Sequence, residues 1–145
     1  MILSELDVRA LTIRQPWAAL IACGVKPVEN RSWPLPASFS GPLLIHAGMR
    51  DDADGWRALR AEPRSTDRTT AQVDYGAIIA VAMNVTCHRD TGCCRDRWGE
   101  PGVWHWVLDD VRRLPEPISA TGRLKLWTPE PEAASAALAV PQSTG

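Results

Sequence analysis

The chain has 145 residues, of which 45% are hydrophobic, and its formal net charge is −1. This length favours one domain with a modest core, and the apolar content excludes wholesale disorder. The charge excludes a protein that depends on non-specific attraction to phosphate, because such proteins carry a strongly basic surface.

The cell compartment is predicted from apolar runs and cysteine use. No run approaches the roughly 20 apolar residues of a membrane helix. The N-terminal MILSELDVR is too short and too acidic for a signal peptide. We therefore expect a cytoplasmic protein without membrane contact. In that reducing compartment the four cysteines are expected as thiols or metal ligands and not as disulfides.

The first elements are predicted from apolar spacing and from the residues that interrupt it. Residues 1–9 are expected to be a leader, and residues 10–13 (ALTI) a strand. A helix then follows Gln15-Pro16 and ends at Gly24. Three of its apolar residues have i, i+3, i+4 spacing and should face inward: Trp17, Leu20 and Ile21.

The later elements follow the same signals. Strands are predicted at 26–33, 43–47, 76–85, 103–108 and 122–127, and a second helix at 51–60. Polar loops are expected at 61–74 and 88–102, and Pro115 and Pro117 are expected to break the chain. Residues 128–145 contain no Lys or Arg and little pattern, so we expect a disordered tail after a domain at 10–127.

The number and order of these elements predict the fold class. Five or six short strands with one or two helices, and no βαβ rhythm, predict an α+β fold. We expect a small, mostly antiparallel β-barrel with one or two flanking helices. An open α+β sheet is the alternative.

Charged, amide and aromatic side chains gather around the end of the first helix. Strand alternation places Glu29, Arg31 and Trp33 on one face. A solvated strand with this pattern needs no function. However, the wider set offers flat surfaces for stacking and forked donors and acceptors, as a base-reading site does. Its members are Gln15, Trp17, Lys26, Glu29, Arg31 and Trp33.

Three further residues are candidates for the same site. His46 lies in the apolar run LLIHA, where a histidine is more often a hydrogen-bonded core residue. His105 lies between Trp104 and Trp106, and alternation puts it on the face opposite to both tryptophans, which we expect to belong partly to the core. Trp98 follows the cysteines of the 88–102 loop and is a candidate lid over the site.

Metal and cofactor signals are weak. Four potential zinc ligands lie within eight residues, but their spacing is not the paired C-x₂₋₄-C of structural sites, so thiols in a loop are the expectation: Cys87, His88, Cys93 and Cys94. The sequence has no glycine-rich phosphate loop, no HExxH and no nucleophile elbow. We therefore expect no cofactor.

The segment LTIRQPWAALIACGVKPVENRSWP resembles the opening of the ASCH domain family, with its GxKxxExR stretch. The resemblance continues at 41–48 (GPLLIHAG), 76–90 and 98–114, and it spans roughly residues 10–127. It implies a β-barrel related to the PUA and EVE/YTH group, with a cleft between the barrel and the first helix. Members of that group resemble RNA binders, and some ASCH proteins are amidohydrolases acting on an acylated cytidine or are reported to cut RNA.

The resemblance places Lys26, Glu29 and Arg31 on the family's cleft-lining positions. Amidohydrolase-type members have a threonine nucleophile where this chain has Glu29. A carboxylate there suits a general base, with Lys26 polarising an amide carbonyl, or a pairing partner that does no chemistry. The expected function is therefore binding of RNA or of a nucleoside or modified base, with Trp33 or Trp98 stacking. The alternatives are a hydrolase with Lys26 and Glu29 catalytic, either an amidohydrolase or a ribonuclease, and an interaction protein without a small ligand.

Overall fold

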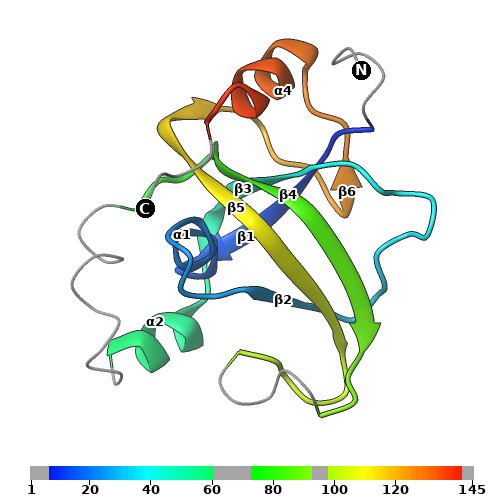
Figure 1. Ribbon diagram of the computed structural model, residues 1–145. Helices are drawn as coiled ribbons and strands as arrows, with labels where there is room; N and C mark the ends of the chain where they lie inside the picture. The colour runs from blue at the N-terminus through cyan, green and yellow to red at the C-terminus, as the bar shows by residue number, and fades with distance from the viewer. Residues whose placement is uncertain (1–6, 61–72, 93–97, 142–145) are drawn as a thin grey trace.

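A computed structural model describes residues 7–60, 73–92 and 98–141 of the chain. In chain order these ranges contain β1 (Arg9–Gln15), α1 (Trp17–Ala22), β2 (Val28–Arg31), β3 (Leu43–Asp51), α2 (Ala53–Arg60), β4 (Ala77–Arg89), β5 (Trp104–Ser119), β6 (Leu126–Trp127) and α4 (Pro131–Leu138) (Figure 1). Most of the predicted leader and of the 61–74 loop, together with Cys93 and Cys94, lies outside the described residues.

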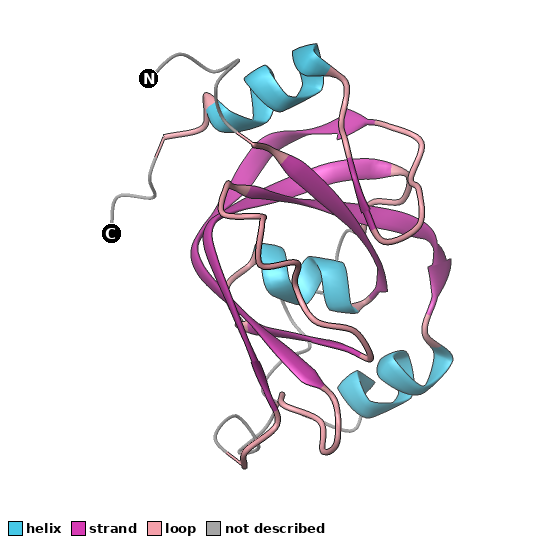
Figure 2. Cartoon of the chain, turned by 90° about the vertical axis from the view of Figure 1, so that its right-hand side faces the viewer, coloured by secondary structure: helices cyan, strands magenta, loops and turns pink. Residues whose placement is uncertain are grey.

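The strands form one six-stranded sheet in the order β2-β5-β4-β3-β1-β6. It curls around α1 without closing (Figure 2). The prediction of a barrel is therefore wrong, and the alternative of an open α+β sheet is confirmed. The expectation of mostly antiparallel strands is correct, since four of the five strand pairs in the described ranges are antiparallel. The sheet is mixed because β1 and β3 run parallel, which requires the crossover through α1 and β2. It stays open because β2 and β6, at its two ends, form no ladder with each other.

The sheet carries a hydrophobic core on each face. In β3, Ile45 belongs to the core that includes α1 and Trp106, while Leu44 belongs to the core that includes Trp127 and α4. Strand β4 begins with an unbroken buried run, Ala77–Ala82, because it is covered on both faces. This explains why the 76–85 segment reads as continuously apolar.

Strand β5 is longer than predicted and passes through Pro115 and Pro117. Residues 114–117 lie opposite Ile79 alone, since Arg113 pairs with Ala80 and Ile118 with Ile78. Strand β2 covers the other edge of β5 only at residues 104–107. Both prolines therefore lie at a bulge beside an unpaired edge, where a missing N–H costs no ladder hydrogen bond.

Residues 131–138 form a helix, so the expectation of a disordered tail is wrong there. Helix α4 starts with a proline in its first turn and is rich in alanine, the best helix former. Ala134 and Ala137 are buried with Trp127 and Leu44. The buried stripe of this helix therefore consists of small apolar residues, which is why the sequence showed little pattern there. Residues 142–145 lie outside the described part, and β6 covers only the end of the predicted 122–127 strand.

None of the helices within the described ranges has the length and apolar character that crossing a membrane requires.

The packing of α4 can be tested with two alanines in the same helix. Ala137 is fully buried and Ala136 is exposed. We expect Ala137→Glu to lower the free energy of unfolding by about 2 kcal/mol or more, because it places a charge in the core beside Trp127. Ala136→Glu should change it by no more than about 0.5 kcal/mol. Urea unfolding of the two variants measures both values, and equal stabilities would contradict the docked position of α4.

Candidate functional site

Lys26, Glu29 and Arg31 form one ionic cluster, and both carboxylate oxygens of Glu29 take part in it. Oε1 lies 3.3 Å from Lys26 Nζ, and Oε2 lies 3.0 Å from Arg31 Nε and 2.8 Å from Arg31 Nη2. Lys26 Nζ also donates to the Val28 carbonyl. The side chains of Lys26 and Glu29 are 4% and 8% exposed, against 24% for Arg31, so Arg31 is the member that reaches solvent.

The end of α1 and the register of β2 bring the cluster together. Gly24 has a φ of +82°, and the Lys26 amide then donates to the Leu20 carbonyl at 3.1 Å, which holds Lys26 next to the helix end. In the β2–β5 ladder Glu29 is paired with Trp106, a fully buried core residue. Glu29 therefore points to the core side of the sheet, and only its pairing with two cations makes its burial tolerable.

Arg31 also connects the edge strand β2 with β1, on the other side of the opening of the sheet. Its Nη2 donates to the Thr12 carbonyl of β1 at 3.1 Å, although β1 and β2 share no ladder. Within the described part of the chain Nη1 has no hydrogen-bond partner. The guanidinium is thus fixed on two sides and keeps one pair of N–H donors for another molecule.

Two tryptophans extend the cluster. Lys26 Nζ lies 5.6 Å from the centroid of the Trp17 ring, and Trp98 packs edge-on against that ring at 6.3 Å. Trp17 Nε1 donates to Asp52 Oδ2 at 2.8 Å, and this bond holds the pKa of Asp52 below its usual value. A Cβ at Gly55 would lie 2.6 Å from the Trp17 ring, so α2 packs on it only with glycine at that position.

Asn30 and His105 hold the segment that carries Trp98. Asn30 Nδ2 donates to the Trp98 carbonyl at 2.8 Å, and the Glu100 amide donates to Asn30 Oδ1 at 2.9 Å. His105 is fully buried, and its Nε2 donates to the Glu100 carbonyl at 2.7 Å. Asn30 and His105 are paired across the β2–β5 ladder, so they form one support on the sheet face opposite to Glu29.

The other predicted site residues have structural contacts. Gln15 is buried, accepts from the Ala19 amide at 2.9 Å and donates to the Asp74 carbonyl at 2.8 Å, so its amide ties α1 to the segment before β4. Trp33 packs edge-on against Trp106 with ring centroids 4.9 Å apart and belongs to the border of the core. Trp106 itself is core, as expected for the tryptophan face of β5.

His46 belongs to a polar group beside Trp127, at the core that also includes α4. Its Nε2 donates to the Ala120 carbonyl at 2.7 Å, which leaves Nδ1 to accept from Thr12 Oγ1 at 3.2 Å. Trp127 Nε1 donates to the same hydroxyl at 3.0 Å. Both ring nitrogens are thus engaged away from the ionic cluster, in agreement with the core-histidine alternative. Burial lowers the pKa of His46, although its bond to Ala120 opposes the shift.

Of the four candidate zinc ligands only Cys87 and His88 lie within the described residues, and they make separate contacts. Cys87 accepts from the Leu35 amide at 3.4 Å and borders the core, whereas His88 packs edge-on against His105 at 5.4 Å. Neighbouring residues of a strand point to opposite faces, which explains the separation. Among the described residues no three His, Cys, Asp or Glu side chains are grouped as for a metal ion.

Asn30 and Asp52 are the supporting residues that the sequence interpretation missed. Asn30 is the alternate residue between Glu29 and Arg31, so strand alternation placed it on the other face but gave it no role. Asp52 precedes α2, and its Oδ1 accepts from the Gly55 amide at 3.1 Å as a helix cap does. The signal for Asp52 was therefore present, as an acidic residue near the start of a predicted helix.

The pairing of Glu29 can be tested against an exposed ion pair in the same chain. We expect Glu29→Gln to lower the free energy of unfolding by about 3 kcal/mol or more, because it leaves Lys26 buried without a counter-charge. Asp54 and Arg57 form an exposed pair at 2.8 Å. Asp54→Asn should therefore change stability by no more than about 0.5 kcal/mol. Urea unfolding near neutral pH compares them, and a Glu29→Gln variant as stable as the parent would contradict the buried network.

The lowered pKa of His46 predicts a stability that depends on pH. As pH falls below about 6.5, the unfolded chain takes up a proton that the folded chain resists, so the free energy of unfolding decreases. One such group contributes a slope of at most about 1.4 kcal/mol per pH unit. We expect His46→Gln, whose amide can replace both hydrogen bonds, to lose this part of the slope in urea unfolding across that pH range. An unchanged slope would contradict the assignment to His46.

Comparison with known proteins agrees with this fold. The family model of the ASCH domain matches residues 11–99. No curated protein matches the chain. Among solved structures the crystal structure of a mutant of the ZmASCH protein from Zymomonas mobilis is similar, with a TM-score of 0.50 and 16% sequence identity over 92% of this chain and 96% of that chain. At this identity the likeness concerns the fold, whereas the family model covers more than half of the chain. The chain belongs to the ASCH domain family.

Proposed function

We propose that the ionic cluster, with Trp17 and Trp98, binds a nucleobase or nucleoside, either free or as an unstacked base of RNA. The family is generally linked to RNA binding, which supports this class of ligand. The net charge of −1 suits one specific contact better than a long electrostatic track along a backbone.

The observation that carries the proposal is that the Arg31 guanidinium is held in place and still has donors left for a ligand. Its Nε and Nη2 are fixed by Glu29 and by the Thr12 carbonyl, while Nη1 keeps its donors and the side chain is 24% exposed. A guanidinium held in this way has little conformational entropy to lose, and its planar fork matches base carbonyls, ring nitrogens or phosphate oxygens. The cluster contains two cations and one anion, which favours an electron-rich partner.

The aromatic part of the proposal depends on Trp17 and Trp98. Asp52 holds the Trp17 ring at the Lys26 side of the cluster, and Asn30 holds the backbone of Trp98, whose ring packs against Trp17. Both tryptophans are half-buried, so each is partly exposed to solvent. Stacking on an aromatic side chain contributes about 1–3 kcal/mol per base.

The contacts of Glu29 favour binding over hydrolysis. A general base needs an oxygen that can accept a proton, but both oxygens of Glu29 already accept from Lys26 and Arg31. This geometry fits the pairing role that the sequence left open for Glu29. Hydrolysis, which would assign Lys26 and Glu29 to catalysis, is therefore an outcome of the test and not a second proposal.

The test compares Arg31→Gln with Arg112→Gln by ligand-observed NMR. Arg112 is a matched control, because it is similarly exposed, at 20%, and pairs with Asp110 at 2.9 Å. The ligands are unmodified nucleosides, acylated cytidines and short single-stranded RNAs, followed for binding and for product. We expect Arg31→Gln to weaken binding about tenfold or more, as loss of one charged hydrogen-bonded contact does, and Arg112→Gln to leave it unchanged.

Three outcomes would overturn the proposal. Equal affinities of the two variants would remove Arg31 from the site. Appearance of a deacylated or cleaved product would move the assignment to a hydrolase. Absence of binding across the whole panel would favour a protein that interacts only with other proteins.

A further inference from the structure

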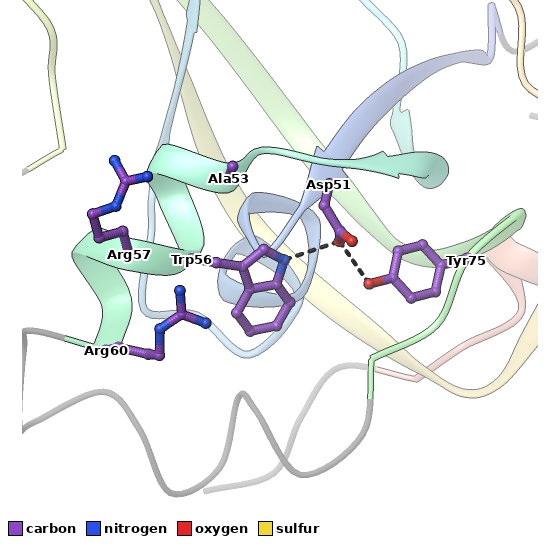
Figure 3. A pocket seen from close by; sticks show the side chains of 6 residues that line it. All are labelled: Asp51, Ala53, Trp56, Arg57, Arg60 and Tyr75. Carbon is purple, nitrogen blue, oxygen red and sulfur yellow. Dashed lines mark hydrogen bonds between the residues drawn. The ribbon is translucent and has the colours of Figure 1, made fainter.

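A second group of aromatic and basic side chains lies outside the ionic cluster, next to α2. It surrounds a hollow of about 420 Å³, which we call the α2 hollow (Figure 3). This volume is within the range of about 300–1,000 Å³ that is typical of small-molecule sites. Six residues line it: Asp51, Ala53, Trp56, Arg57, Arg60 and Tyr75.

One carboxylate oxygen organises the two aromatic rings of the hollow. Asp51 Oδ1 accepts from Trp56 Nε1 at 2.9 Å and from the Tyr75 hydroxyl at 2.6 Å (Figure 3). These bonds lower the pKa of Asp51 and raise the pKa of Tyr75 to about 12, so the acceptor stays charged and the hydroxyl stays a donor near neutral pH. The polar ends of both rings are therefore engaged, and their faces are oriented before any ligand arrives.

Two guanidiniums complete the lining. Arg57 and Arg60 are three residues apart on α2 and so lie on neighbouring positions of one helix face. Arg57 Nη1 pairs with Asp54 at 2.8 Å, but both side chains are well exposed and such a pair is weak. Arg60 makes no ion pair with any residue that the structure describes. The lining thus has two cations against the single carboxylate of Asp51.

The hollow and the ionic cluster are connected through adjacent residues. Asp51 holds Trp56 and Tyr75, whereas Asp52, the next residue, holds Trp17 through a bond of 2.8 Å. Helix α2 lies between the two sites, since Gly55 packs on the Trp17 ring while Trp56 faces the hollow. Two platforms of rings with nearby cations, connected through adjacent residues, are what successive nucleotides of a single strand require.

We propose that the α2 hollow binds a second nucleotide of a single-stranded RNA, with its base on Trp56 or Tyr75 and its phosphate on Arg60. The inference rests on the proposed function of the ionic cluster and deepens it. It identifies the ligand as a strand and not as a free nucleoside, because a free nucleoside would leave the second platform empty.

The test measures fluorescence anisotropy of a labelled, unstructured oligoribonucleotide, with nucleoside binding followed separately by NMR. We expect Trp56→Leu and Arg60→Gln each to weaken oligonucleotide binding about tenfold and to leave nucleoside affinity unchanged. Loss of one phosphate contact should also make the slope of log affinity against log salt shallower by about 0.7 in Arg60→Gln. Arg113→Gln, an exposed arginine of β5, is the control and should match the parent protein.

Several results separate this inference from the proposed function. Parental oligonucleotide affinity in both hollow variants would overturn the inference even if Arg31→Gln abolishes nucleoside binding. Reduced nucleoside affinity in Arg60→Gln would also overturn it, because the hollow would then belong to the first site. Nucleoside binding that is insensitive to Arg31→Gln, with oligonucleotide binding lost in Arg60→Gln, would overturn the proposed function instead. Double-stranded RNA offers no unstacked base, so effective competition by a duplex would contradict the stacking role of Trp56 and Tyr75.

Discussion

The rest of the molecule depends on the pairing of the Glu29 carboxylate with Lys26 and Arg31. The carboxylate neutralises a buried lysine on one side and orients Arg31 on the other, and Arg31 then reaches the Thr12 carbonyl across the opening of the sheet. Strand β2 pairs with β5 over only four residues, so this side-chain bridge is what ties the edge of the sheet to β1. The groups proposed to bind a ligand are therefore also the groups that hold the fold together. Any loss of binding in the cluster has to be compared with the stability of the variant.

Much of the fold was predictable where local pattern decides the structure. The apolar runs of β3 and β4 and the spacing in α1 gave the correct elements, because burial of these segments is visible in their own residues. Closure of the sheet and the direction of β1 relative to β3 depend on pairing between distant segments, which no local pattern encodes. Residues 131–138 were missed for another reason. Their buried stripe consists of alanines, which carry little hydrophobic signal although they are strong helix formers.

The candidate site was predictable in its charges but not in its supports. Strand alternation correctly placed Glu29 and Arg31 together. Gln15 was also selected for its amide, and His46 and His105 for their positions on predicted strands. In the structure each of them makes hydrogen bonds that buried polar groups need in any protein. Conversely, Asp51 and Tyr75 lie 24 residues apart and meet only after the sheet has formed, so their shared hydrogen bond has no signature in the sequence.

The bond between Trp127 and Thr12 has a consequence for how the chain reaches its native state. It joins residues that are 115 positions apart, and β6 pairs in the sheet with β1. The β4–β5 ladder connects nearer segments, whereas β1 lacks its β6 neighbour until residues 126 and 127 have been synthesised. Distant pairing of this kind slows folding. During translation β1 therefore leaves the ribosome before its partner β6, and its unpaired edge is open to wrong pairing with other chains until β6 follows.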